Sequence, residues 1–149
     1  METESKKLII NPNIKNIYGF LILDTDKLLI GTVSKDKKEI NLKKNIFFDR
    51  WKIRRGGAST TRFYRIYRDR IAKTVKLIDD NLEKIFIMEN KLEISGIILA
   101  GTSKTIERYL SSKCRNKDLN EYITTIIEID YGGELGFNQA IQLSMLNIQ

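Results

Sequence analysis

Cationic residues are concentrated in one stretch of the chain, between residues 43 and 76. Twelve lysines and arginines stand there against two acids, Asp49 and Asp69, so the stretch carries a net charge of +10, whereas the whole 149-residue chain carries +7. The rest of the chain is therefore slightly acidic. A clustered positive charge of this size favours a polyanionic partner, and nucleic acid fits it better than a membrane surface does.

A pair of glycines, Gly56-Gly57, lies at the centre of this basic stretch, directly after Arg54 and Arg55. Paired glycines cost a folded chain backbone entropy, so they usually stand where a positive φ or a close backbone approach is needed. The pattern predicts an exposed basic loop whose backbone approaches a bound group closely.

The absence of histidine restricts the chemistry open to the chain. With no histidine and one cysteine, Cys114, the sequence excludes Ser-His-Asp and Cys-His nucleophiles and ordinary zinc sites. Four carboxylates could serve a metal-dependent nuclease, namely Asp24, Asp26, Glu128 and Asp130. We favour the simpler interpretation that they form turns and are solvated, and we expect no metal and no cofactor.

Length and composition indicate one domain, with residues 1–16 as a polar lead-in and 17–149 as the folded unit. Hydrophobic residues make up 42% and charged residues 30% of the chain, which is typical of a soluble globular protein. No apolar run approaches the roughly 20 residues of a membrane span, and no targeting peptide is recognisable. A single cysteine fits a reducing compartment, so we expect a cytoplasmic location.

The first half of the chain predicts a three-stranded meander followed by a long helix. Residues 17–23 and 27–33 form a hairpin, and a third strand runs from Glu39 to about Phe48. Ser59, Thr60 and Thr61 offer N-cap hydroxyls for a helix from Thr61 to about Met88. The inward positions of that helix are predicted to be Phe63, Ile66, Tyr67, Ile71, Thr74, Ile78, Leu82, Ile85 and Phe86.

The second half predicts alternating strands and helices. A buried strand at 92–100 precedes a short helix at 103–110, a polar connection at 111–120, a strand at 122–129, a glycine-rich turn at 130–136 and a last helix from Phe137 to about Asn147. The order β-β-β-α-β-α-β-α implies an α/β fold with a mixed five-stranded sheet flanked by helices. This is the ribonuclease-H-like order of elements, which describes topology and not function.

With these elements placed, residues 17–146 resemble the middle domain of the eukaryotic and archaeal class 1 peptide-chain release factors. The resemblance rests on Tyr18-Gly19-Phe20, on Arg55-Gly56-Gly57 with Arg62-Phe63, on residues 95–101 (SGIILAG) and on residues 131–141 (YGGELGFNQAI). The last block is the longest and the most specific.

The resemblance implies a role at the ribosomal peptidyl-transferase centre. In that family a Gly-Gly-Gln tip promotes hydrolysis of the ester that joins the nascent peptide to the P-site tRNA. Gly56 and Gly57 match the two glycines, but Ala58 stands in place of the glutamine. It therefore implies that Gly56, Gly57 and Ala58 form the catalytic tip, with ribosome binding intact and hydrolysis weakened or lost.

The residues expected to bind nucleic acid surround this tip: Lys52, Arg54, Arg55, Ser59, Arg62, Arg65 and Arg68. The implied partners are large-subunit rRNA at the peptidyl-transferase centre and the P-site tRNA, with no membrane. Family members also carry a codon-reading domain and a domain that contacts a partner GTPase, and we expect this domain alone not to bind that GTPase. The alternatives are a stand-alone, non-catalytic factor that occupies the ribosome in dormancy or rescue, and a structural RNA-binding domain.

Overall fold

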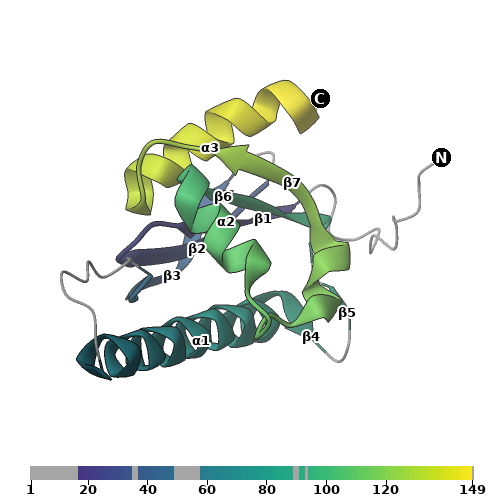
Figure 1. Cartoon of the computed structure of the whole chain (residues 1–149). Coiled ribbons are helices and arrows are strands. Elements are labelled where there is room, and N and C mark those ends of the chain that lie inside the picture. The colour runs from purple at the N-terminus through teal and green to yellow at the C-terminus, as the bar shows by residue number, and fades with distance from the viewer. Residues whose placement is uncertain (1–16, 35–36, 49–57, 89–90, 93, 149) are drawn as a thin grey trace.

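The computed structural model of the chain describes residues 17–34, 37–48, 58–88, 91–92 and 94–148 (Figure 1). Its elements are, in order, β1 (Tyr18–Leu23), β2 (Lys27–Val33), β3 (Lys38–Asn45), α1 (Ala58–Phe86), β4 (Ile87–Met88), β5 (Lys91–Leu92), β6 (Gly96–Gly101), α2 (Ser103–Ser111), the 3-10 helix η1 (Lys117–Tyr122), β7 (Ile123–Glu128) and α3 (Gly133–Ile148).

Five of the strands form one mixed sheet in the order β3-β2-β1-β6-β7. The β1–β2 and β2–β3 pairs are antiparallel, whereas β6 pairs in parallel with both β1 and β7. This confirms the predicted fold class. The meander forms because short polar turns join its strands, and the parallel pairs follow because helices connect the later strands.

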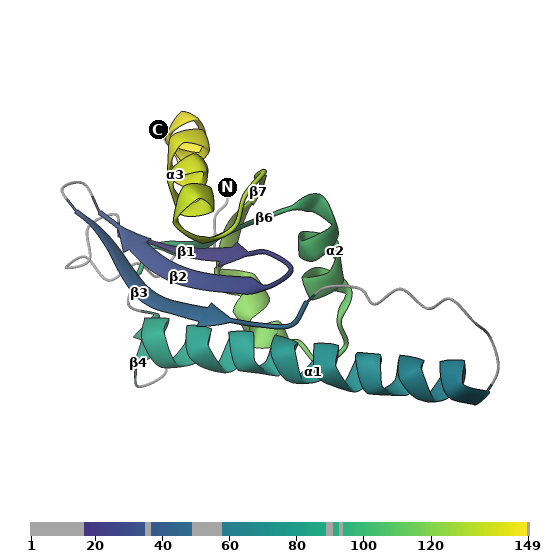
Figure 2. The same ribbon diagram turned by 90° about the vertical axis from the view of Figure 1, so that its left-hand side faces the viewer.

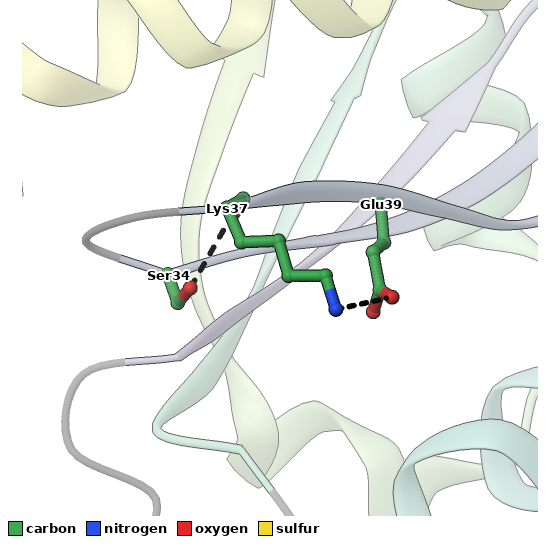
Figure 3. Close-up of polar contacts among 3 residues, drawn as sticks. All are labelled: Ser34, Lys37 and Glu39. Atoms are coloured by element: carbon green, nitrogen blue, oxygen red, sulfur yellow. Dashed lines mark hydrogen bonds and ion pairs between the residues drawn. The ribbon is translucent and has the colours of Figure 1, made fainter.

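A short turn joins β2 to β3 at the edge of the sheet (Figure 3). The Ser34 N–H donates to the Lys37 carbonyl at 2.8 Å, and the Ser34 hydroxyl contacts the same oxygen at 3.5 Å. Lys37 also forms an ion pair with Glu39 at 3.0 Å. These contacts close the hairpin where β3, the exposed edge strand, begins.

Helices cover both faces of the sheet, so the domain has three layers (Figures 1 and 2). Successive side chains of β1 point to opposite faces of the sheet, so the strand contributes to a hydrophobic core on each face. Leu21 and Leu23 face α1 and α2, while Phe20 and Ile22 face α3 through Phe137 and Ala140. None of the described helices is both long and apolar enough to cross a bilayer.

Two predicted strand boundaries are wrong, because hydrogen bonds to other segments end one strand early and divide the other. β3 ends at Asn45, since the N–H groups of Ile46 and Phe48 donate to the carbonyls of Asp26 (3.1 Å) and Thr25 (2.7 Å) in the β1–β2 turn. The strand predicted at 92–100 is divided. Leu92 pairs with Ile87 in a separate two-stranded ribbon, and β6 begins only at Gly96.

Two helical segments were also predicted wrongly. The polar connection contains η1, which begins where the Asn116 side chain accepts the N–H of Asp118 at 3.0 Å. Helix α3 begins at Gly133, one turn before the predicted start, because Gly133 adopts a φ of +62° and the Gly136 N–H bonds to the Gly132 carbonyl at 3.1 Å. Glycine adopts such a φ without steric cost.

Candidate nucleic-acid interface

Helix α1 is packed against the sheet over its C-terminal half. Among its described side chains, the buried ones begin at Thr74 and continue through Val75, Ile78, Asp79, Leu82 and Phe86. Between residues 62 and 70, the described side chains are exposed except for half-buried Tyr67. Figure 2 shows the N-terminal end of α1 extending beyond the sheet and the other helices. Residues 58–70 correspond to about 20 Å of helix at 1.5 Å per residue.

The inward stripe of α1 differs from the predicted one in three residues. Ile66 is 42% exposed, because it lies on the face opposite to the core, whereas Val75 and Asp79, which were not predicted, are buried. The side chain of Phe63, predicted to face inward, lies outside the described part of the chain. Ile71, Ile78, Leu82 and Phe86 lie on the inward side as predicted. Burial of this stripe secures the second half of α1, which in turn supports the projecting first half.

Phe47 anchors the chain to α1 just before residue 49. Its carbonyl accepts a hydrogen bond from the Thr74 hydroxyl at 2.9 Å, and its ring meets that of Tyr67 edge-on with centroids 6.2 Å apart. The Arg70 guanidinium lies 5.5 Å from the centre of the same ring, a cation–π contact. Three successive turns of α1 therefore hold Phe47 in place.

Phe48 anchors the same point to the body of the domain. Its side chain is fully buried in the core beneath α1 and α2, and its N–H donates to the Thr25 carbonyl at 2.7 Å. Its carbonyl accepts a hydrogen bond from the Arg108 guanidinium of α2. Phe47 and Phe48 therefore fix the chain to α1, α2 and the core immediately before residue 49.

The exposed part of α1 is strongly basic. Six cations stand at solvent-exposed positions between 62 and 76 against one acid, Asp69, and they are Arg62, Arg65, Arg68, Arg70, Lys73 and Lys76. A helix N-terminus also carries a partial positive charge, and its first N–H groups have no partner within the helix. The field of the helix end therefore adds to that of the side chains.

The predicted nucleic-acid-binding arginines Arg62, Arg65 and Arg68 thus lie together on the exposed half of α1. Ala58 is the first residue of that helix. Ser59 lies in the first turn, as Thr60 and Thr61 do, so the prediction that these three hydroxyls precede the helix as N-caps is wrong. The remaining predicted site residues, Lys52, Arg54, Arg55, Gly56 and Gly57, fall outside the described part of the chain.

Two of the four carboxylates considered for a nuclease, Asp24 and Asp130, form local hydrogen bonds. The Asp24 carboxylate accepts the N–H of Thr25 at 2.7 Å. Asp130 exchanges two hydrogen bonds with Gln139 of α3, one through its backbone N–H and one through its carboxylate. Among the described residues there is no group of three or more acidic, cysteine or histidine side chains that could hold a metal ion. The nuclease interpretation therefore has no support in the part of the chain that the structure describes.

Sequence reasoning did not identify how the arginine-bearing helix is fixed to the body. Thr74, Arg70 and Tyr67 hold Phe47, and Arg108 contacts Phe48 across 60 residues of sequence. Helical spacing of Tyr67, Arg70 and Thr74 at three and four residues places them on one side of α1, which was the available signal.

Comparison with known protein families assigns the chain. The family model described as eRF1 domain 2 matches residues 17–149.

The chain belongs to the eRF1 domain 2 family.

Two relatives of the chain are release-factor subunits. Subunit 1 of the eukaryotic peptide chain release factor from Loxodes striatus is 32% identical over 132 residues, which cover 89% of this chain and 30% of that protein. The corresponding subunit from Didinium nasutum is 32% identical over 142 residues, covering 95% of this chain and 32% of that protein. The chain therefore spans about a third of the length of these relatives.

Solved structures share the fold at lower identity. The archaeal translation termination factor aRF1 superposes with a TM-score of 0.65 at 16% identity, over 85% of this chain and 34% of that one. Dom34 of S. cerevisiae, described as a translation termination-like factor involved in RNA quality control pathways, superposes with a TM-score of 0.51 at 14% identity, over 89% of this chain and 34% of that one.

Proposed function

We propose that this eRF1 domain 2 binds the ribosome at the peptidyl-transferase centre, in the manner of a translation-termination factor. The observation that carries the proposal is the exposed, basic N-terminal half of α1, which directly follows the Gly56-Gly57 sequence. The chain's membership of the eRF1 domain 2 family supports the proposal. The two relatives named above, which are release-factor subunits, support it as well.

In this proposal the Gly56-Gly57 loop enters the centre beside the acceptor end of the P-site tRNA. Lys52, Arg54, Arg55 and Ser59 contact RNA near the tip, and Arg62, Arg65 and Arg68 bind phosphates along the projecting helix. The body of the domain stays outside the cavity, because the N-terminal half of α1 extends away from the sheet (Figure 2). Arginine suits this role, since its planar guanidinium binds phosphate oxygens in pairs.

The reaction proposed for the family type is water attack on the peptidyl-tRNA ester. Backbone N–H donors near the tip stabilise the oxygen charge that develops, and one such donor contributes roughly 3–4 kcal/mol where it has been removed from a hydrolase. Ala58 retains its N–H at the start of α1 but has no side-chain amide to orient the water. We therefore infer that the chain binds and that hydrolysis is weakened or lost.

A second candidate function follows from the same residue. A domain that occupies the peptidyl-transferase centre without hydrolysing the ester acts as a ribosome-occupying factor, in dormancy or rescue. The observation that favours it is Ala58 itself, which removes the amide while leaving the basic helix unchanged. The two candidates make the same prediction for binding but differ in peptide release, which is weakened but measurable for a termination factor and absent for a ribosome-occupying factor.

The deciding experiment measures release of a labelled peptide from ribosome-bound peptidyl-tRNA by the chain and by its Ala58→Gln variant. We expect Ala58→Gln to release peptide about 100-fold faster, the size of effect produced by one well-placed hydrogen-bond donor. Co-sedimentation with ribosomes, run in parallel at two salt concentrations, should be equal for both proteins.

The outcomes separate the candidates. Measurable release by the unaltered chain favours termination, and release by the variant only favours the ribosome-occupying factor. If neither protein co-sediments with ribosomes, the proposal of a ribosomal partner is wrong.

A further inference from the structure

Tyr64 is an aromatic side chain for which neither the fold nor phosphate binding provides a use. It lies in the projecting half of α1 and is 47% exposed. Three residues on, half-buried Tyr67 packs its ring against Phe47. Tyr64 lies one turn further from the body than Tyr67, and the contacts that hold Phe47 come from Tyr67, Arg70 and Thr74.

The position of Tyr64 on the helix is informative. It precedes Ile71 by seven residues and Ile78 by fourteen, so it continues the stripe that is buried in the second half of α1. Beyond the sheet this stripe turns from a core surface into an exposed surface. Tyr64 therefore lies on the same side of α1 as the buried residues, but beyond the part of the helix that packs against the core.

Two arginines stand close to Tyr64 in the helix. Arg68 follows Tyr64 by four residues and is its neighbour on the helix surface, and Arg65 is the next residue in sequence. Both arginines are exposed. An exposed aromatic ring with exposed arginines nearby is the combination that holds unpaired nucleotides, with the base stacked on the aromatic face and the phosphates on the arginines.

We propose that Tyr64 forms a stacking site for one unpaired RNA base, with Arg65 and Arg68 binding its flanking phosphates. The inference rests on the proposed RNA partner and adds the nucleotide contact to it. RNA is the occupant because the exposed half of α1 holds one acid, Asp69, among its arginines, so a surface of that charge attracts a polyanion. Stacking is tolerant of base identity, since every base offers a π-face.

The test compares two single-stranded probes, an oligoadenosine decamer and an abasic decamer with the same phosphodiester backbone. Binding to the full chain is measured by fluorescence anisotropy. We expect the chain to bind the base-bearing probe more tightly. Tyr64→Ala should weaken binding of the base-bearing probe by about 5- to 30-fold and leave binding of the abasic probe unchanged.

Three variants serve as controls. Tyr64→Phe keeps an aromatic face and should retain the preference for the base-bearing probe. Tyr131→Ala removes a tyrosine of similar exposure, 52%, that precedes α3 and lies outside α1, and it should have no effect. Arg65→Gln should weaken binding of both probes and reduce the slope of log affinity against log salt by about 0.7. Tyr64→Ala should leave that slope unchanged.

Two results would overturn the stacking site. One is an equal loss of affinity for both probes in the Tyr64→Ala variant, which would mean that Tyr64 only supports the helix. The other is no loss on either probe, which would leave the exposed ring to a protein partner. Either result leaves the ribosomal proposal standing, because ribosome co-sedimentation of the unaltered chain decides that proposal separately.

Discussion

Asp79 is a buried carboxylate that accepts hydrogen bonds from two other parts of the domain. Its side chain is 3% exposed, and it accepts hydrogen bonds from the Tyr109 hydroxyl at 2.5 Å and from the Asn116 N–H at 2.6 Å. The Arg115 guanidinium lies 4.6 Å from the centre of the Tyr109 ring. The network joins α1 to α2 and to the segment before η1.

Burial determines the direction in which Asp79 responds to pH. Desolvation raises the pKa of this carboxyl above 3.8, against the opposing effects of Tyr109, Asn116 and Arg115, and Asp80 adds a smaller push upward. Burial likewise raises the pKa of Tyr109. A group whose pKa is higher in the folded state stabilises the fold below its unfolded pKa, and this contribution is lost as the pH rises through the folded pKa.

We therefore expect the Asp79 carboxyl to favour folding most at acid pH. The difference in free energy of unfolding between the unaltered chain and Asp79→Asn should fall as the pH is raised above 3.8. Urea denaturation at intervals from pH 3 to pH 7 measures it. A difference that stays constant or grows over this range would contradict the assignment.

At the scale of the element, α1 combines two functions in one continuous helix. Its second half packs under the sheet and its first half carries exposed arginines. Replacing the projecting cations should therefore change binding without changing stability.

The double variant Arg62→Gln/Arg65→Gln tests this separation. Each phosphate contact contributes about 0.7–0.9 to the slope of log affinity against log salt, so we expect the slope for ribosome binding to fall by about 1.5. The matched control Lys104→Gln/Lys113→Gln removes the same charge from exposed positions on α2 and after it, and its slope should stay unchanged. Equal slopes for the two double variants would show that only net charge matters.

Local patterns predicted most of the elements and part of the candidate site. The hairpin of β1 and β2 and the amphipathic second half of α1 have clear periods, and Arg62, Arg65 and Arg68 are exposed as expected. The boundaries failed where a contact distant in sequence decides the structure. The Phe48 N–H bonds to Thr25, and Leu92 pairs with Ile87, so neither residue continues its predicted strand.

The same reason limits prediction of the site. The inward stripe of α1 was assigned from the spacing of its residues alone. That spacing does not indicate that the N-terminal part of the helix extends beyond the sheet. Exposure of Tyr64 follows from the extension of α1 beyond the sheet, and the clamp on Phe47 follows from the docking of α1. Both are properties of the packed domain and not of the segment.

At the scale of the whole molecule, stability should decrease along α1 away from the sheet. Residues 74–86 contribute side chains to the core, whereas the described side chains of residues 62–70 are exposed apart from half-buried Tyr67, and helices without packing are marginal in water. We expect the amides of residues 66–70 to exchange with deuterium at least about 10-fold faster than those of residues 78–86. Exchange measured by NMR at neutral pH gives both rates, and equal protection would contradict this.

The pairing of β1 with β6 affects how the chain can fold as it is synthesised. Tyr18 of β1 lies opposite Gly96 of β6, with β2, β3 and all of α1 between them in sequence. The meander can therefore leave the ribosomal tunnel complete while one edge of β1 still lacks its partner. Such an edge pairs readily with other chains. Contacts between residues far apart in sequence also form slowly, so addition of β6 is expected to limit the rate of folding.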